Sequence, residues 1–316
     1  MRRHSGAPIL TRSDIPEIAG LRGDMSSVFN PGAIRCGDEY RLLLRVQARS
    51  RESHLLWASS RDGRSFSVEP RLMTIAGIEH VGERIYHVYD PRLTQIEDTL
   101  YCCFAADIDG GCRVGIARVK EDWGLELLSY DQSEDSRNAV LFPRKIGGSF
   151  LRLDRPNRQQ HAGGPSSGSV IEISRSKDLQ HWERLGPVAS GRPHFWDELI
   201  GAGPPAIECD EGWLQVYHGV ATHFASSNIY QAGVLLLDKE DPRKVLRRSR
   251  GNILEPREIW ELTGQVPGVV FPSGLVRGQG DELLLYYGAA DSCVGLATTT
   301  VAELLLACDD DAHALT

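Results

Sequence analysis

The feature that most constrains the fold is an internal repeat that occurs five times along the chain. The five segments share one rhythm, in which a proline opens an apolar stretch that is followed by a polar turn and a second apolar stretch. The aligned prolines recur at nearly even spacing and are Pro31, Pro91, Pro143, Pro205 and Pro272. A regular repeat of this kind is typical of architectures in which each unit buries its apolar face against the next.

A second marker trails the first in every repeat. It is an apolar stretch ending in a polar turn that contains an acid, and the acids are Asp62, Asp122, Asp178, Asp241 and Glu303. Both markers give one period of about 60 residues, enough for a unit with the pattern hairpin, strand, turn, strand, which is a four-stranded blade. The sequence therefore predicts an all-β fold, a five-bladed β-propeller spanning residues 1–316 as a single domain. A short helix from Val301 should close or decorate the last blade.

The charged residues argue against a nucleic-acid partner. The chain carries 35 Lys+Arg against 43 Asp+Glu, a formal charge of −8, and shows no basic stripe that could neutralise a phosphate backbone. Only five of the basic residues are lysines, which leaves 30 arginines. Two explanations remain open: a compositional bias of the genome, or a few arginines whose guanidinium forks bind anions.

Three further signals bear on location and cofactors. The seven cysteines are scattered without a CxxC pair, which favours reduced thiols in the cytoplasm. The N-terminus lacks the apolar region of a signal peptide, and no apolar run approaches the roughly 20 residues that cross a bilayer, so we expect no membrane association. The ten histidines show no metal-ligand spacing, so we expect no metal site.

The repeat register gathers polar residues at the ends of blade strands, where they should converge on the central channel. They are Asn30, Arg45, Asp90, Arg155, His218 and Asp291. Such a cluster is suited to an anion site beside an acid. Three of its members also have plain structural explanations: Asp90 could cap a turn, His218 could be a core histidine, and Arg155 could pair with Asp154.

Seven motifs resemble glycoside hydrolase family 130, over about residues 25 to 305. They are FNPGA from Phe29, YDPRLT from Tyr89, NAVLFPRKIGGSFLRLDRP from Asn138, IGAGPPAI from Ile200, WLQVYHGV from Trp213, GVLLLDKEDPRKVL from Gly233, and VVFPSGL from Val269 followed by LLLYYGAAD. That family contains β-mannoside phosphorylases and some β-mannosidases, on a five-bladed propeller.

The resemblance implies an inverting mechanism in which Asp90 is the general acid and Tyr89 lies beside it. The proton of Asp90 would reach the glycosidic oxygen through a sugar hydroxyl. A phosphorylase needs only this one carboxyl group, because inorganic phosphate is the nucleophile, whereas most glycosidases need two. The sugar whose bond is cut would be held by Asn30, Arg45 and Asp291, with Tyr230 near the acceptor sugar. The matched phosphate contacts are Arg137, Asn138, Arg155 and His218. Phosphate would be the co-substrate, with no metal or organic cofactor.

One departure from the family pattern keeps a second function open. Phosphorylases of the family usually carry a lysine just before IGAGPP, where this chain has Leu199, preceded by Asp197 and Glu198. The sequence therefore predicts a cytoplasmic β-mannoside phosphorylase that forms α-mannose 1-phosphate from a β-manno-oligosaccharide or mannosyl-glycoside. The alternative is an inverting β-mannosidase with Glu198 or Asp197 as base, and a third reading is a non-catalytic sugar-binding propeller.

Linkage and acceptor should depend on two loops at the mouth, Gln159 to Gly168 and Ala221 to Asn228. Assembly into a homo-oligomer is compatible with the sequence but not indicated by it.

Overall fold

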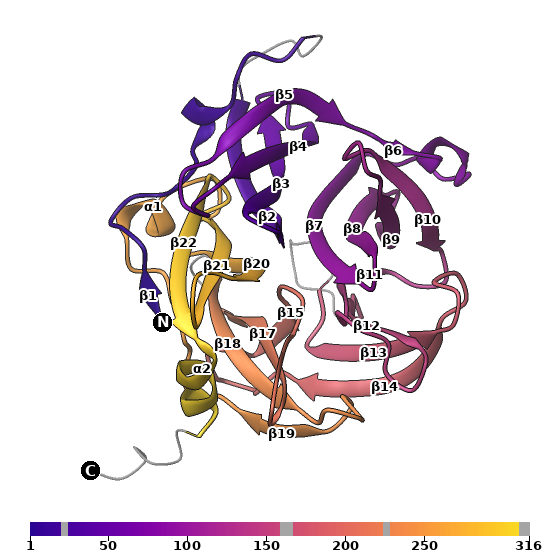
Figure 1. Cartoon of the computed structure of the whole chain (residues 1–316), viewed down its shortest axis with the longest axis vertical. Coiled ribbons are helices and arrows are strands. Elements are labelled where there is room, and N and C mark those ends of the chain that lie inside the picture. Colours follow the sequence, from indigo (N-terminus) through magenta and orange to yellow (C-terminus); the bar gives the residue numbers. More distant parts are fainter. Residues whose placement is uncertain (20–24, 159–166, 224–227, 310–316) are drawn as a thin grey trace.

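The computed structural model describes residues 1–19, 25–158, 167–223 and 228–309. Within these ranges the strands form five separate sheets around a common centre, each built mostly from consecutive strands (Figure 1). The predicted five-bladed β-propeller is confirmed. Parts of the two expected mouth loops, 159–166 and 224–227, lie outside the described residues.

The first four blades follow the order of the chain from the centre outwards. Blade 1 contains β2 (Met25–Cys36), β3 (Glu39–Ala48), β4 (Ser53–Ser60) and β5 (Ser67–Met73). Blade 2 contains β7 (His87–Ile96), β8 (Thr99–Ile108), β9 (Gly111–Val119) and β10 (Leu125–Asp131), with β6 (Ile75–Ala76) at its outer edge. Blade 3 contains β11 (Ser136–Leu141), β12 (Phe150–Pro156), β13 (Val170–Ser176) and β14 (Glu183–Ser190). Blade 4 contains β15 (Leu199–Ala202), β16 (Ile207–Cys209), β17 (Gly212–Ala221), β18 (Ile229–Leu237) and β19 (Val245–Arg248).

Blade 5 departs from the repeat pattern because its fourth strand comes from the other end of the chain. Its inner strands are β20 (Val270–Arg277), β21 (Glu282–Ala289) and β22 (Cys293–Thr300), and β1 (Arg2–Arg3) pairs with β22 on the outside. The two ends of the chain therefore close the ring together (Figure 1). The C-terminal helix α2 (Val301–Cys308) decorates the blade, since Leu304 and Cys308 pack into the core between blades 4 and 5.

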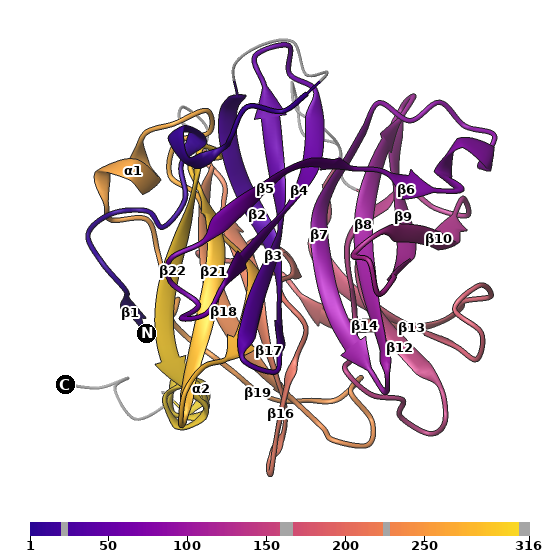
Figure 2. The same ribbon diagram turned by 45° about the horizontal axis from the view of Figure 1, so that its top comes forward.

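The hydrophobic core is divided into one large cluster at each of the five contacts between neighbouring blades. Successive side chains of a strand point to opposite faces of the sheet, so one apolar strand contributes to the core on both sides of its blade. In β3, Leu42 and Leu44 pack toward blade 5 while Leu43 packs toward blade 2. Both faces of each blade therefore contribute to the core, and the blades stand side by side around the ring (Figure 2).

The acids of the second sequence marker cap their own turns in three of the repeats, and Asp122 does so by accepting a hydrogen bond from the backbone N–H of Gly124 at 3.0 Å. Asp62 Oδ1 accepts hydrogen bonds from the backbone N–H groups of Arg64 and Ser65 at 2.8 Å, and Asp178 caps its own turn in the same way. In blade 4 Asp238 performs this task in place of Asp241. Short helices occupy the connections η1 (Arg12–Asp14), η2 (Ile78–His80) and α1 (Ile259–Leu262). No helix of the described residues is both long and apolar enough to cross a membrane.

Candidate active site

The innermost strands of blades 1, 2 and 3 share a bulge at the same height. The pairing of each with the next strand shifts register after Phe29, Tyr89 and Arg137 respectively. One residue in each bulge adopts the left-handed conformation: Asn30 (φ 46°), Asp90 (φ 52°) and Asn138 (φ 59°). Asn and Asp tolerate this conformation better than other residues with a side chain, and a bulge re-aims the side chain that it carries. The repeat thus places three polar groups around the channel.

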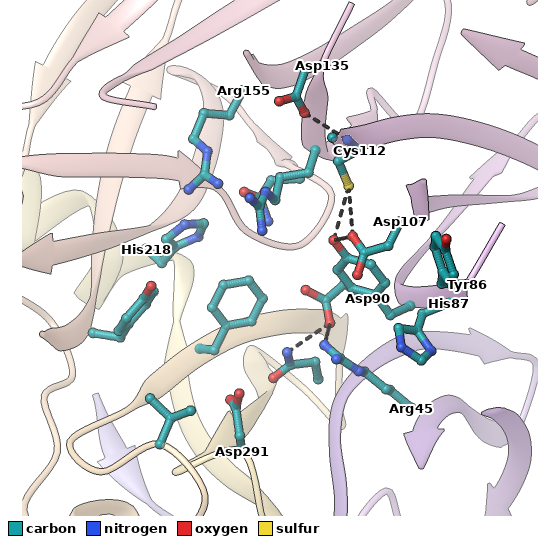
Figure 3. Close-up of a pocket in the computed structure, with 18 of the residues that line it drawn as sticks. Arg45, Tyr86, His87, Asp90, Asp107, Cys112, Asp135, Arg155, His218 and Asp291 are labelled. Atoms are coloured by element: carbon teal, nitrogen blue, oxygen red, sulfur yellow. Dashed lines mark hydrogen bonds and ion pairs between the residues drawn. The ribbon is translucent and has the colours of Figure 1, made fainter. Parts of the chain in front are cut away.

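These groups line a cavity of about 770 Å³. All ten residues predicted from the sequence line it: Asn30, Arg45, Tyr89, Asp90, Arg137, Asn138, Arg155, His218, Tyr230 and Asp291. They come from all five blades, so the site exists only when the ring is complete. Figure 3 shows Asp90 near the middle, with Arg45 and Asp291 on one side of it and Arg155 and His218 on the other.

Asp90 is held by two side chains of blade 1. Its Oδ1 accepts hydrogen bonds from Asn30 Nδ2 at 2.9 Å and from Arg45 Nη1 at 3.0 Å, so it does not act as the cap of a turn. The guanidinium of Arg45 lies between the rings of Phe29 and Tyr89, 4.5 and 4.6 Å from their centroids, which fixes its direction. Because both contacts use Oδ1, the other carboxylate oxygen of Asp90 is left for a substrate.

A second carboxyl group lies on the same side of the cavity. Asp291 is in the left-handed turn between β21 and β22. Burial, and to a smaller extent the negative charge of Asp90, raises the pKa of Asp291 to about 6 against the opposing effect of Arg45. The two carboxyl groups therefore differ in their environments, as groups with different tasks do.

The other side of the cavity is cationic. Arg137 and Arg155 are direct cross-strand partners on β11 and β12. Arg155 does not pair with Asp154, whose carboxylate instead binds Arg152 at 2.9 Å. Burial and the neighbouring charge of Arg137 lower the pKa of Arg155 to about 10, so it is still a cation at neutral pH.

His218 is buried in β17, and burial followed by the charges of Arg155, Arg92 and Arg137 holds its pKa well below the ordinary value. It is therefore a neutral imidazole at pH 7, packed 4.7 Å from the ring of Phe271. It is not an ordinary satisfied core histidine, because neither ring nitrogen has a hydrogen-bond partner among the described residues.

Two more buried polar atoms of this side have no partner within the described part of the chain, Asn138 Oδ1 and Arg155 Nε. Buried polar atoms are nearly always paired, so a group of them around one cavity marks the place of a bound polar ligand.

The comparisons with known proteins agree with this geometry. The family model described as beta-1,4-mannooligosaccharide phosphorylase matches residues 1–310. The chain belongs to glycoside hydrolase family 130. Family 130 relatives include the beta-1,4-mannooligosaccharide phosphorylase of Ruminococcus albus, 30% identical over 315 residues that cover 96% of this chain and 89% of the relative. The 1,2-beta-oligomannan phosphorylase of a Thermoanaerobacter species is also 30% identical, over 96% of this chain and 98% of its own. The beta-1,2-mannobiose phosphorylase of Listeria innocua, solved with beta-1,2-mannobiose, matches with a TM-score of 0.83 at 26% identity, covering 98% of this chain and 99% of that one.

Blade 2 provides one wall of the cavity, and apart from Tyr89 and Asp90 the residues of this wall were not predicted from the sequence. Tyr89 Oη donates to Asp107 Oδ1 at 2.6 Å and lies 3.0 Å from Cys112 Sγ, and the wall continues through Tyr86, His87 and Asp135. Asp107 is near the end of β8 and Cys112 near the start of β9, so they flank the β8–β9 hairpin of blade 2, which corresponds to the β21–β22 hairpin that carries Asp291 in blade 5. Extending the repeat register to this hairpin would have found them.

The carboxylates beside Leu199 do not line the cavity. Asp197 is fully buried and accepts hydrogen bonds from Arg192, Arg248 and Tyr217. Tyr217 precedes His218 in β17, so its side chain lies on the opposite face of the blade. Glu198 accepts a hydrogen bond from Thr222. Neither acid is placed to activate a water in the site, which removes the geometric basis for a hydrolase that uses either of them as base.

Within the described residues, no three His, Cys, Asp or Glu side chains are grouped so that they could hold a metal ion.

Proposed function

We propose that this protein is an inverting β-mannoside phosphorylase, which uses inorganic phosphate to cleave a β-mannosidic bond and releases α-mannose 1-phosphate. The observation that carries the proposal is the division of one cavity into a carboxyl side around Asp90 and a cationic side around Arg137 and Arg155. Three relatives that are 30 or 31% identical to this chain are named as phosphorylases of manno-oligosaccharides, oligomannan and mannobiose, which supports the substrate class.

In the proposed reaction, an oxygen of phosphate forms a bond to the anomeric carbon while the bond from that carbon to the glycosidic oxygen breaks. The glycosidic oxygen, which carries away the bonding electrons, receives the proton of Asp90, directly or through a sugar hydroxyl as the family resemblance implies. Attack from the face opposite the leaving oxygen converts the β-mannoside to an α-phosphate. Asn30 and Arg45 hold Asp90 in place, and together with Asp291 they would bind the sugar whose bond is cut.

The cationic side would orient the phosphate and stabilise its charge. Two guanidinium forks match phosphate oxygens. Because His218 is neutral, it can donate one hydrogen bond to phosphate without adding charge, and Asn138 lies on the same side. The unpartnered atoms of His218 and Arg155 are the hydrogen-bonding capacity that phosphate would fill.

We further propose that phosphate is the co-substrate, that no metal or organic cofactor is needed, and that the enzyme works in the cytoplasm as a single catalytic domain. All seven cysteines are free thiols, which fits a reducing compartment. Tyr230, which stacks against His218 at a centroid distance of 6.2 Å, is proposed to approach the acceptor sugar.

The test is to incubate the protein with β-1,4-mannobiose and β-1,2-mannobiose, with and without phosphate, and to identify the products. We expect α-mannose 1-phosphate and mannose only when phosphate is present. The Asp90→Asn variant, prepared in the same way, controls for contaminating enzymes. Free mannose formed at the same rate without phosphate would identify a hydrolase and refute the proposal. Binding of mannosides without turnover would indicate a sugar-binding propeller.

A further inference from the structure

One buried amide joins the two arginines of the cationic side. Asn157 Oδ1 accepts a hydrogen bond from Arg137 Nε at 3.2 Å and another from Arg155 Nη2 at 3.3 Å. Asn157 follows directly after the end of β12, is only 9% exposed, and is not among the residues that line the cavity. It thus contacts both arginines without lining the cavity itself.

The amide is itself held in one orientation. Its Nδ2 donates to Asp135 Oδ1 at 2.7 Å, and its backbone N–H donates to the Asp135 carbonyl at 2.9 Å. The same Asp135 Oδ1 accepts the backbone N–H of Cys112 at 2.9 Å, which anchors the group to blade 2. Because a carboxylate accepts and cannot donate, Nδ2 must face Asp135, and the amide oxygen must therefore face the arginines.

An amide oxygen at this point differs from the carboxylates that bind two other arginines of this chain. Buried Arg152 is neutralised by Asp131 and Asp154, and Arg3 by Glu261. A carboxylate at position 157 would likewise bind both guanidinium groups, but it would add a negative charge where phosphate must bind. An amide accepts the same two hydrogen bonds and adds no charge.

We propose that Asn157 is a positioning residue for phosphate: its single oxygen fixes the spacing of Arg137 and Arg155 without neutralising them. This role rests on the proposed phosphorylase function. It predicts that the charge at position 157, more than its shape, controls the affinity for phosphate.

The test compares Asn157→Asp with Asn157→Ala. Asn157→Asp keeps the shape of asparagine but adds a charge, and it also sets a second carboxylate against Asp135, so its effect on folding is measured separately from its effect on phosphate binding. If Asn157 positions the arginines without neutralising them, Asn157→Asp is the more severe. It should raise the KM for phosphate at least about tenfold and more than Asn157→Ala does, while the KM for the mannoside stays within about twofold. The increase in thermal unfolding temperature that phosphate produces, which requires no turnover, should shrink in the same order.

Asn252→Asp is the matched control. Asn252 Nδ2 also donates to a carboxylate, Glu255 Oε2 at 3.1 Å, so this change places two carboxylates together in the same way but outside the cavity. We expect it to lower stability without changing the KM for phosphate.

The outcomes distinguish a failure of the positioning role from a failure of the proposed function. If the wild-type protein shows phosphate-dependent cleavage but Asn157→Asp keeps its KM for phosphate, or raises both KM values equally, the positioning role is refuted and the proposed function stands. If the wild-type protein shows neither phosphate-dependent cleavage nor stabilisation by phosphate, the proposed function fails and the positioning role fails with it.

Discussion

Replacing Arg3 by alanine should destabilise the propeller at the place where β1 pairs with β22 and closes the ring. Arg3 is one of the two residues of β1, and its guanidinium donates to Glu261 through Nε at 2.8 Å and Nη2 at 2.7 Å. The Glu261 side chain is fully buried and also accepts hydrogen bonds from Tyr287 Oη and from the backbone N–H groups of Arg257 and Glu258. The substitution would leave this carboxylate without its counter-charge.

The magnitude follows from the burial of the pair. Removing one partner of a buried ion pair costs about 3–5 kcal/mol. Unfolding entropy of about 2.1 cal/mol/K per residue gives roughly 0.66 kcal/mol/K for 316 residues, so the unfolding temperature should fall by about 5–8 °C. The neighbouring Arg2 is the matched control, because its side chain is 80% exposed and its ion pair with Glu303 spans 3.5 Å. Arg2→Ala should cost at most about 1 kcal/mol.

The assay is thermal unfolding of the wild-type protein, Arg2→Ala and Arg3→Ala, followed by calorimetry. Burial alone would raise the pKa of Glu261, but the hydrogen bonds from Arg3, Arg257 and Glu258 outweigh it and hold the pKa below its ordinary value. Such a carboxylate contributes stability that is present above its unfolded-state pKa and is lost as pH falls through the lower folded-state pKa. The difference between Arg3→Ala and the wild-type protein should therefore shrink in acid below about pH 4. Equal unfolding temperatures for Arg2→Ala and Arg3→Ala at pH 7 would refute the reasoning.

Three further predictions concern the cavity. Asp90→Asn should lower kcat/KM for mannobiose by at least about 10³-fold while calorimetry still detects sugar binding, and a fully active variant would exclude Asp90 as the acid. Gly201→Ala places a methyl group 2.4 Å from the ring of His218, so the ring must move and the KM for phosphate should rise several-fold in a protein that still folds; an unchanged KM would remove His218 from the phosphate site. The pKa of Asp291 is about 6, so the carboxyl group becomes protonated as pH falls through 6 and the KM for the mannoside should rise; Asp291→Asn should abolish that pH dependence, and a variant that retains it would assign the titration to another group.

The repeat period was sufficient to predict the fold and most of the site because propeller geometry converts sequence register into position. Residues at equivalent strand ends of different blades must meet at the channel, and Asn30, Asp90 and Asn138 do so through one recurring bulge. The family resemblance added Tyr89, Arg137, Asn138 and Tyr230, all of which line the same cavity.

The parts that could not be predicted depend on contacts between distant or short segments. Strand β1 contains only Arg2 and Arg3 and pairs with β22 at the opposite end of the chain, so no local pattern of alternation reveals it. The link between Asn157 and Asp135 joins two positions beyond the ends of β11 and β12, and its meaning depends on which amide atom faces which partner. Sequence cannot supply that orientation.

The charge balance of the cavity explains why such a link matters in this chain. Leu199 occupies the position where family phosphorylases usually carry a lysine, and His218 is neutral. Of the three arginines that line the cavity, Arg45 already binds Asp90. A phosphate dianion would therefore meet two positive charges on the cationic side. No further positive charge on that side would compensate if one of the two guanidinium groups were displaced. Affinity must then depend on the geometry of Arg137 and Arg155, and a neutral group that sets their spacing has more effect here than in a site with a third cation.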